Sequence, residues 1–439
     1  MCQEFFSKMF VNLSEKKVAI YTLGCKVNQY ESDSMMDILK KEGCKIVQFS
    51  EYADVYIINT CSVTNMADRK SRQIIHRAKK INPNGVVVAV GCYVQAAKEQ
   101  LLQDKDIDIV VSNNRKKDIA RLLDEYFCTS KVNDNFIDIN ATKDYEDMWL
   151  VKPSEHCRAY VKVQDGCNNF CTYCIIPYTR GRIRSRELSN VIAEIEGLAE
   201  RGIKEVVITG INLSSYCDSN GASLLDLLLS VSRIPGIERI RMGSLEPRVI
   251  TEEFLKAISN EPKICPHFHL SLQSACNETL KRMNRKYTIE EYMDKCNLIR
   301  KYYDRPALTT DVIVGFPGET DVEFDITYKN LQKLNLYEMH IFKYSKRNGT
   351  IAATMPNQVP EDVKNKRSEI LLDMTKNHKD AYEASFVREK IKVLIEEYEE
   401  KDGKYFAKGH TERYILCRWE EQEEYCKNHV NDIVEIEYK

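Results

Sequence analysis

The chain has 439 residues, enough for two or three domains with separate cores. Its 64 basic and 66 acidic residues give a formal net charge of −2, so overall charge does not indicate a nucleic-acid-binding protein. No apolar run approaches the length of a membrane span, and the first residues lack the pattern of a secretory signal. We therefore expect a cytoplasmic protein, in whose reducing compartment the 16 cysteines are thiols or metal ligands.

The first segment, residues 14–145, alternates short apolar runs with helical stretches. Fully apolar runs between helices predict an open parallel α/β sheet covered on both faces. The runs are at 18–23, 55–59, 86–90 and 107–111.

Cysteines follow three of these runs directly, at Cys25, Cys61 and Cys92. Parallel strands place their carboxyl ends on one edge of the sheet, where open α/β sheets bind ligands. We therefore expect the three thiols to converge on one site. The alternative is that they are ordinary core residues, since free cysteine is commonly buried. Their equivalent positions favour ligands.

The second segment, residues 150–375, contains six strand-like runs separated by helical stretches. This pattern predicts a partial (βα)6 TIM-like barrel with its functional site at the carboxyl ends of the strands. The runs are at 159–164, 204–210, 238–244, 268–273, 309–315 and 338–344.

The loop after the first of these runs reads DGCNNFCTYC and places Cys167, Cys171 and Cys174 in a C-x3-C-x2-C pattern. Three thiolates can hold three irons of a [4Fe–4S] cluster and leave the fourth iron open for a substrate or cofactor. A zinc site would more often bring paired C-x2-C units and a fourth ligand. The three cysteines of the first segment predict a second cluster of the same kind.

The third segment, residues 376–439, has four short strand-like runs with turn signals between them, which predict a small antiparallel β-barrel. It contains 12 basic and 16 acidic residues. RNA binding would need one face built from basic residues, with Tyr405 or Phe406 for base stacking. The basic candidates are Lys404, Lys408, His410, Arg413 and Arg418. The alternative is a structural barrel that packs on the second segment.

Taken together, the chain resembles the methylthiotransferase family of radical S-adenosylmethionine (SAM) enzymes over nearly its whole length. The matching strings are TLGCKVNQYESD (22–33), NTCSVTNMA (59–67), GCYVQ (91–95), DGCNNFCTYCIIPYTRGRIRSR (165–186), LSLQS (270–274), TDVIVGFPGET (310–320) and YSKRNGT (344–350). The resemblance implies a cysteine-bearing N-terminal domain, a radical SAM barrel and a C-terminal TRAM-like RNA-binding domain.

The resemblance also implies the chemistry. The cluster of Cys167, Cys171 and Cys174 would cleave SAM to a radical, and the second cluster would hold the sulfur that is inserted. The product would be a methylthio group on C2 of an adenine, whose C–H bond is not acidic enough for a general base to remove. An electron donor such as flavodoxin and a monomeric enzyme are expected.

The string GCKVNQYES resembles the branch that acts on N6-threonylcarbamoyladenosine at position 37, in the anticodon loop of tRNA. The alternatives within the family are isopentenyladenosine in tRNA and an aspartate of a ribosomal protein. A different class of function would be a non-catalytic iron–sulfur protein for RNA binding or electron transfer. It is disfavoured because both cysteine sets leave an iron open.

Several further residues lie at or beyond the predicted barrel-strand ends or beside the cysteine motif, where polar side chains suit cofactor or substrate contacts. Each could instead cap a helix, close a loop or pack. The candidates for binding SAM or substrate are Tyr173, Gly210, Asn212, Glu246, Gln273, Arg285 and Asp311. His267 and His269, at a strand start, are expected to be structural.

Two basic patches are candidates for phosphate contacts with tRNA. The first alternates directly after the cysteine motif, at Arg180, Arg182, Arg184 and Arg186. The second lies on the helix after Cys61, for which a solvated helix face is the alternative. It comprises Arg69, Lys70, Arg72, Arg77, Lys79 and Lys80.

Overall fold

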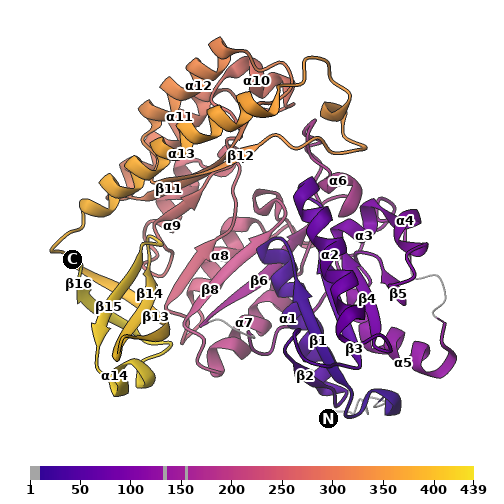
Figure 1. Cartoon of the computed structure of the whole chain (residues 1–439). Helices are drawn as coiled ribbons and strands as arrows, with labels where there is room; N and C mark the ends of the chain where they lie inside the picture. Colours follow the sequence, from indigo (N-terminus) through magenta and orange to yellow (C-terminus); the bar gives the residue numbers. More distant parts are fainter. Residues whose placement is uncertain (1–9, 132–135, 154–156) are drawn as a thin grey trace. The chain divides into compact units, whose positions relative to one another are not determined.

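The computed structural model of the chain describes residues 10–131, 136–153 and 157–439 (Figure 1). Residues 1–9, on which the expectation of no secretory signal partly rests, lie outside this part. Two compact units are present. The first holds the residues up to 152 together with 165–168 and 174–184, and the second holds the remaining segments of the chain.

The first unit is built on a parallel sheet with the strand order β2-β1-β3-β4-β5, which confirms the predicted open α/β sheet. Every residue of β3 and β4 is buried, which explains why their sequences are continuously apolar. The three-residue strand β2 is an addition to the prediction. The bounds are β1 Lys17–Thr22, β2 Lys45–Val47, β3 Val55–Thr60, β4 Val86–Gly91 and β5 Ile109–Val111.

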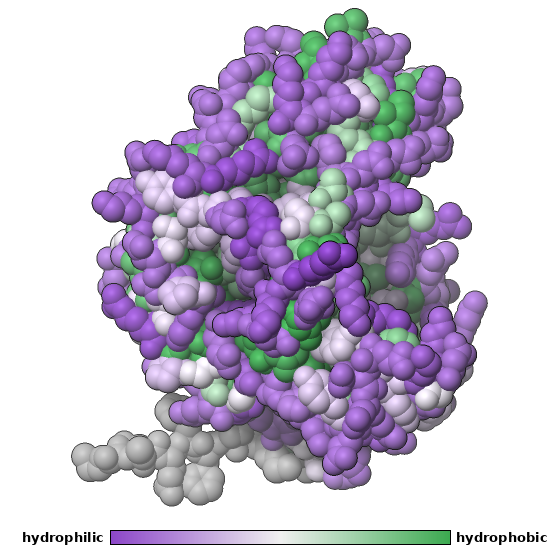
Figure 2. Space-filling model, turned by 90° about the vertical axis from the view of Figure 1, so that its left-hand side faces the viewer, coloured by the Kyte–Doolittle hydropathy of each residue, from purple (hydrophilic) through white to green (hydrophobic). Residues whose placement is uncertain are grey.

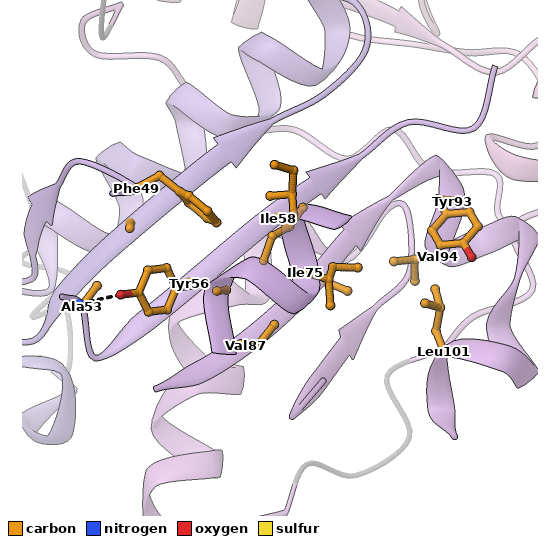
Figure 3. Packing of buried hydrophobic residues seen from close by; sticks show 13 residues of the cluster. Phe49, Ala53, Tyr56, Ile58, Ile75, Val87, Tyr93, Val94 and Leu101 are labelled. Carbon is orange, nitrogen blue, oxygen red and sulfur yellow. Dashed lines mark hydrogen bonds between the residues drawn. The ribbon is translucent and has the colours of Figure 1, made fainter. Parts of the chain in front are cut away.

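Helices cover both faces of this sheet. On one face, α2 packs Ile75 against Ile58 and Val87 of two neighbouring strands, as Figure 3 shows. Each such buried aliphatic side chain contributes about 1.5–3 kcal/mol. The other face is covered by α1 and α5, which contact each other. The helices are α1 Lys26–Lys41, α2 Asn65–Ile81, α3 Cys92–Ala96, α4 Lys98–Leu102 and α5 Ile119–Thr129, with 3-10 turns η1 Val11–Leu13 and η2 Lys116–Asp118.

Six strands of the second unit follow the predicted partial barrel. β6, β8 and β9 form one parallel sheet with the two-residue β7, and β10, β11 and β12 form another. Isolated parallel bridges, such as Leu245 to Leu270, join the two. The partial (βα)6 barrel is therefore confirmed. The bounds are β6 Arg158–Asp165, β7 Arg184–Ser185, β8 Glu205–Gly210, β9 Arg239–Met242, β10 His267–His269, β11 Ala307–Val314 and β12 Glu338–Lys343.

Three helices of the barrel begin with capping boxes, in which a hydroxyl and a carboxylate three residues later satisfy free backbone N–H groups. The boxes pair Ser223 with Asp226, Thr288 with Glu291, and Thr320 with Glu323. They fix where each loop ends. The helices that follow barrel strands are α7 Leu188–Glu200, α8 Leu224–Ser232, α9 Glu252–Ile258, α10 Asn277–Arg282, α11 Ile289–Tyr302 and α12 Asp321–Leu334, and the 3-10 turns are η3 Leu213–Ser215, η4 Pro247–Val249 and η5 Ile351–Ala353.

The C-terminal part is a four-stranded antiparallel sheet of order β15-β14-β13-β16, as predicted for a small TRAM-like barrel. The expected boundary at residue 376 falls inside the long helix α13 (Glu361–Ala384), and the sheet begins at Lys390. Asp402 and Gly403, both with positive φ, make the predicted hairpin turn. The bounds are β13 Lys390–Lys401, β14 Lys404–Thr411, β15 Leu416–Glu421, α14 Glu423–Asn428 and β16 Ile433–Glu437.

This terminal sheet packs against the amino ends of the barrel strands. Arg241 donates hydrogen bonds to the carbonyl oxygens of Thr411 (3.1 Å) and Glu412 (2.9 Å). Arg239 donates to those of His410 and Lys392, both at 2.9 Å. The terminal sheet therefore lies at the barrel end opposite to the carboxyl ends of the strands.

The basic residues proposed for an RNA-binding face of the terminal sheet are each paired with a glutamate. The pairs are Lys404 with Glu420 (2.8 Å), Lys408 with Glu399 (2.7 Å), His410 with Glu396 (2.7 Å), Arg418 with Glu399 (2.6 Å) and Arg413 with Glu412. Since their charges are already balanced, the alternative of a structural, packing sheet is favoured.

The face drawn in Figure 2 is largely hydrophilic, with hydrophobic residues in separate areas. None of the described helices is both long enough and apolar enough to span a bilayer.

Candidate active site

The structure places Cys61 and Cys92 directly after β3 and β4, and Cys25 in the short loop that follows β1. Glycines permit this close arrangement. Gly24 has a φ of +108°, and a Cβ there would lie 3.1 Å from the Sγ atom of Cys61. Gly91 has a φ of +98°, and a Cβ there would lie 2.4 Å from the carbonyl oxygen of Thr60. Only glycine fits such positions without strain.

The three thiols of the sheet edge influence one another. Burial, together with the neighbouring thiols of Cys92 and Cys25, raises the pKa of Cys61 to about 12. Cys25 is exposed, and its thiol lies close enough to Arg180 and Cys92 to interact with both electrostatically. The structure thus brings together the three cysteines that the sequence predicted to converge.

Their spacing does not suit a single zinc ion. Tetrahedral coordination with Zn–S bonds of about 2.3 Å requires sulfur atoms about 3.8 Å apart. Among the described residues, no group of three cysteines has all its sulfur atoms within 4.8 Å of one another. A larger polynuclear cluster, which thiolates hold at three corners, fits this set better.

Arg180 lies beside this cysteine set and is completely buried. Its Nε donates to the Sγ atom of Cys92 at 3.3 Å. Nη1 and Nη2 bind the two carboxylate oxygens of Glu31 at 2.9 and 3.1 Å. Nη1 also donates to Asp165 at 3.1 Å, and Nη2 donates to the Oδ1 atom of Asn28 at 2.6 Å. All five N–H donors of the guanidinium are therefore engaged.

Further buried charges extend this network. Lys116 is completely buried and lies 3.1 Å from Glu31, and it donates to Asn113 at 2.6 Å. Arg184 is also buried and lies 3.8 Å from Asp165. Among the described residues, the ion pairs of this network join three cations, including Arg180, to the two carboxylates Glu31 and Asp165. An anionic thiolate at Cys92 would balance the third cation, which fits a metal-ligating cysteine.

The second cysteine set lies in the loop after β6. Cys167 and Cys174 belong to the first unit and Cys171 to the second, so the C-x3-C-x2-C spacing of the loop carries the case for a shared cluster. The backbone N–H of Cys167 donates to Gly181 at 3.0 Å. Thr172, next to Cys171, donates from its backbone to Met283 at 3.1 Å and from its hydroxyl to Arg282 at 2.9 Å.

Arg285, predicted to bind cofactor, contacts a predicted cluster ligand, and its role toward the cofactor stays a prediction. Its Nη1 donates to the Sγ atom of Cys171 at 3.4 Å, and its Nε donates to the hydroxyl of Tyr287 at 2.9 Å. Burial alone would lower the pKa of Arg285, but Tyr173, Tyr287 and Cys171 hold it well above its usual value. Glu246 lies 3.9 Å away.

The other cofactor candidates have the following places. Tyr173 packs edge-to-face on Phe316, with ring centroids 6.3 Å apart. Gly210 ends β8, and the backbone N–H of Asn212 donates to Gln164 at 2.7 Å. Their roles toward SAM or substrate stay predictions.

Glu246 accepts hydrogen bonds from Asn169, in the cysteine loop, and from Arg248 at 3.0 Å. Gln273 has a φ of +76°, and its backbone pairs with β11, where its N–H donates to the carbonyl of Asp311 at 2.9 Å. The carboxylate of Asp311 lies 3.4 Å from His269. His267, expected to be structural, is buried against Tyr414.

The phosphate-contact prediction is wrong for three of the four arginines after the cysteine motif. Arg180, Arg184 and Arg186 are 0%, 3% and 1% exposed, so phosphate cannot reach them. Arg186 is paired with Glu194. Arg182 is exposed and stays a candidate.

On α2, two of the six basic residues already have polar partners within the protein. Arg72 donates to the hydroxyl of Tyr93 at 2.9 Å, and Lys79 pairs with Asp108 at 2.7 Å. The other four, Arg69, Lys70, Arg77 and Lys80, are exposed. Arg69 and Lys70 also line a pocket of about 480 Å³ beside Cys61.

Sequence reasoning missed the network around Arg180, which includes its partners Asn28 and Glu31 and the lysine that pairs with Glu31, Lys116. A signal was present in α1, where Asn28 and Glu31 are three residues apart and therefore on the same helix face. Lys116 lies in a loop-like stretch with no such pattern.

Two family models match the chain. The model described as "Uncharacterized protein family UPF0004" matches residues 17–112, which contain the first cysteine set. The model of the radical SAM superfamily matches residues 161–331, which contain the second.

Solved structures share the fold. The radical SAM methyltransferase TsrM from Kitasatospora setae has a TM-score of 0.56 at 16% identity, and the alignment covers 77% of each chain. The cobalamin-dependent radical SAM enzyme OxsB has a TM-score of 0.52 at 11% identity, covering 84% of this chain and 57% of the other.

Curated relatives are much more similar in sequence. The threonylcarbamoyladenosine tRNA methylthiotransferase MtaB of Bacillus subtilis is 40% identical, with 91% of this chain and 89% of the relative covered. MtaB of Aquifex aeolicus is 41% identical over 87% and 93%. The tRNA-2-methylthio-N(6)-dimethylallyladenosine synthase of Thermoanaerobacter pseudethanolicus is 37% identical over 88% and 83%. The chain therefore belongs to the radical SAM tRNA methylthiotransferase family that includes the MtaB proteins.

Proposed function

We propose that this protein adds a methylthio group to C2 of N6-threonylcarbamoyladenosine at position 37 of tRNA. The observation that carries the proposal is the pair of three-cysteine sets, one at the edge of the parallel sheet and one in the barrel loop. The 40% and 41% identity to two MtaB proteins supports this choice of substrate.

Each cysteine set would hold one [4Fe–4S] cluster through three thiolates. We call the site of Cys25, Cys61 and Cys92 the auxiliary site and that of Cys167, Cys171 and Cys174 the radical site. When bound, the radical-site cluster and SAM supply the radical chemistry, and the auxiliary cluster supplies the sulfur. The residues fit these groups, because an arginine contacts one sulfur of each set.

The substrate base lies in an anticodon loop, where unstacked bases can be turned into a protein pocket. Its threonylcarbamoyl group carries a carboxylate, which requires a cationic or N–H partner. Arg69 and Lys70 supply positive charge at the pocket beside Cys61, and Arg182 supplies an exposed charge in the loop after the cysteine motif. We assign these three side chains to phosphate or carboxylate contacts.

Cofactor candidates at the strand ends keep their predicted roles in this proposal. Tyr173, Asn212, Glu246, Gln273 and Asp311 would orient SAM or the substrate at the carboxyl end of the barrel. We further propose a monomeric, cytoplasmic enzyme that receives electrons from a donor such as flavodoxin.

The second candidate substrate is isopentenyladenosine, favoured by the 37% identity to a dimethylallyladenosine synthase. Mass spectrometry of tRNA nucleosides from a deletion strain separates the two. We expect loss of the methylthio derivative of threonylcarbamoyladenosine and its return with the intact gene but not with the Cys92→Ala gene. Loss of only the isopentenyl derivative would overturn the choice of substrate.

A further inference from the structure

In each cysteine set, one sulfur accepts a hydrogen bond from an arginine whose side chain is at most 7% exposed. Arg180 donates to Cys92 at 3.3 Å and Arg285 to Cys171 at 3.4 Å. Among the described residues, nine cysteines lie outside the two sets, and none of them accepts such a bond from an arginine. The pairing of arginine with sulfur is therefore specific to the predicted cluster ligands.

Both arginines are held so that they cannot turn away from the sulfur. The two terminal nitrogens of Arg180 are bound by Glu31, Asp165 and Asn28, which leaves Nε to face Cys92. The remaining donors of Arg285 bind the carbonyl oxygen of Ser271 at 3.2 Å and the hydroxyl of Tyr287. Such fixed donors need no reorganisation when charge at the sulfur changes.

We propose that Arg180 and Arg285 are positioning residues that raise the reduction potentials of the auxiliary and radical clusters, respectively, through these bonds to a ligand sulfur. The inference rests on the proposed function, since it requires both clusters. Reduction adds one electron from a low-potential chemical reductant to the cluster and breaks no bond in the protein. A positive N–H donor at the sulfur stabilises the extra negative charge, and hydrogen bonds to sulfur are known to set cluster potentials.

The two arginines differ in how much of their charge is already balanced. Arg180 binds two carboxylates within 3.1 Å. The carboxylate of Glu246 is 3.9 Å from Arg285. Because less of its charge is compensated at contact distance, Arg285 acts more strongly on its cluster than Arg180 does.

The test isolates one cluster at a time in the full chain. Replacing Cys167, Cys171 and Cys174 with alanine leaves the auxiliary cluster, and replacing Cys25, Cys61 and Cys92 leaves the radical cluster. Each background is reconstituted anaerobically with iron and sulfide and titrated with dithionite, without SAM. Electron paramagnetic resonance then gives the reduced fraction at each applied potential.

In its own background, each of Arg180→Lys and Arg285→Lys should lower the ratio of reduced to oxidised cluster about tenfold at fixed potential, which is about 59 mV for one electron. The larger shift should belong to Arg285→Lys. Each variant should leave the other cluster unchanged.

Arg241→Lys is the matched control. Arg241 is equally buried and binds Glu205 at 3.0 Å, but it contacts backbone carbonyls of the terminal sheet instead of a ligand cysteine. It should leave both potentials unchanged. Unchanged potentials in Arg180→Lys and Arg285→Lys, at full iron content, would overturn the proposal.

A measurement on the unmodified arginines keeps the proposal testable if a variant fails to fold. Protein labelled with ¹⁵N-arginine should show a ¹⁵N coupling to each reduced cluster by electron–nuclear double resonance. Absence of that coupling in iron-loaded protein would also refute the proposal. Absence of iron in the unmodified protein would instead refute the proposed function.

Discussion

Two buried arginines, Arg180 in the first unit and Arg241 in the second, form similar ion pairs but differ in the other groups that they contact. Each is at most 1% exposed and each binds a buried glutamate, Glu31 or Glu205. The remaining Nε–H of Arg180 meets the sulfur of Cys92, whereas Arg241 donates to two backbone carbonyls of the terminal sheet.

The two networks also differ in the groups that surround their cations. Glu205 lies 3.0 Å from Arg241 and 3.6 and 3.7 Å from Arg158 and Arg239. Arg158 also pairs with Glu396 at 2.5 Å, and Arg239 with Glu412 at 3.8 Å. The network of Arg180 has a second carboxylate, Asp165, and a thiol. A buried ion pair is weak evidence for stability by itself. The role of each network is therefore indicated by the acceptor of the remaining arginine N–H groups, which is a cysteine sulfur for Arg180 and backbone carbonyls for Arg241.

The largest expected effect is the difference between the two cysteines beside these networks. Cys92→Ala should abolish methylthio transfer to tRNA, because the auxiliary cluster loses a ligand. It should still cleave SAM to 5′-deoxyadenosine under reducing conditions, whereas Cys171→Ala should do neither. Reconstituted unmodified protein should bind about eight irons, and the variant lacking all three auxiliary cysteines about half.

Cys265→Ala is the control for that experiment. Cys265 is buried and its thiol is close enough to Arg241 to influence that residue's pKa, but it belongs to neither cysteine set. It should retain iron and product formation. Product formation by Cys92→Ala at the unmodified rate would contradict the assigned role of the auxiliary site.

Replacing the central carboxylates should separate a stability effect from an activity effect. Glu205→Gln removes the carboxylate that binds the buried Arg241 at 3.0 Å, whereas Arg158 keeps Glu396 and Arg239 keeps Glu412. Removing one partner of a buried pair typically costs about 3–5 kcal/mol. Glu31→Gln should cost less stability, because Asp165 still binds Arg180 and Asn113 still accepts a hydrogen bond from Lys116, the other cation beside Glu31.

Thermal unfolding followed by circular dichroism measures the first effect, and product formation measures the second. Glu31→Gln should reduce product formation at temperatures where the protein is fully folded. Equal losses of stability in the two variants would show that the networks do not differ as described.

Sequence alone predicted the elements that depend on local pattern. Continuous apolar runs gave β3 and β4, and cysteines at their ends gave the convergent thiols. The burial of Arg180 in an ion pair could not be predicted from local pattern, because its partner Glu31 is 149 residues away in the sequence. The alternating arginines therefore suggested an exposed patch, although three of them are buried.

The same limit applies to the terminal sheet. Its strands and the turn at Asp402 and Gly403 follow local rules, but Arg239 and Arg241 bind carbonyls more than 150 residues away. The position of residue 376 inside α13 was missed because no glycine or proline breaks that helix.

A pH dependence should distinguish the Glu205 network. Burial alone would raise the pKa of Glu205, but Arg241 and then Arg158 lower it below its usual value. A carboxyl whose pKa is depressed in the folded state contributes stability above the unfolded-state pKa, about 4.3, and loses it as pH falls through the folded-state value.

The difference in melting temperature between the unmodified protein and Glu205→Gln should therefore be greatest near neutral pH. It should shrink once the pH falls below about 4. Melting curves across that range check this result, with Glu278→Gln, on the exposed part of α10, as a control. A constant difference at all pH values would exclude titration of Glu205 as its cause.

The smallest expected effect concerns Arg182, the exposed member of a run whose other members are buried. If it contacts a phosphate, Arg182→Ala should weaken binding of the anticodon stem-loop modestly and reduce the slope of log K against log salt by about 1. Lys408→Ala, at a lysine already paired with two glutamates, should leave the slope unchanged. An unchanged slope for Arg182→Ala would place tRNA contacts elsewhere, with the exposed residues of α2 next to be tested. A reduced slope for Lys408→Ala would instead return the terminal sheet to the RNA-binding surface, because its pairing with Glu397 and Glu399 would then be one that phosphate can displace.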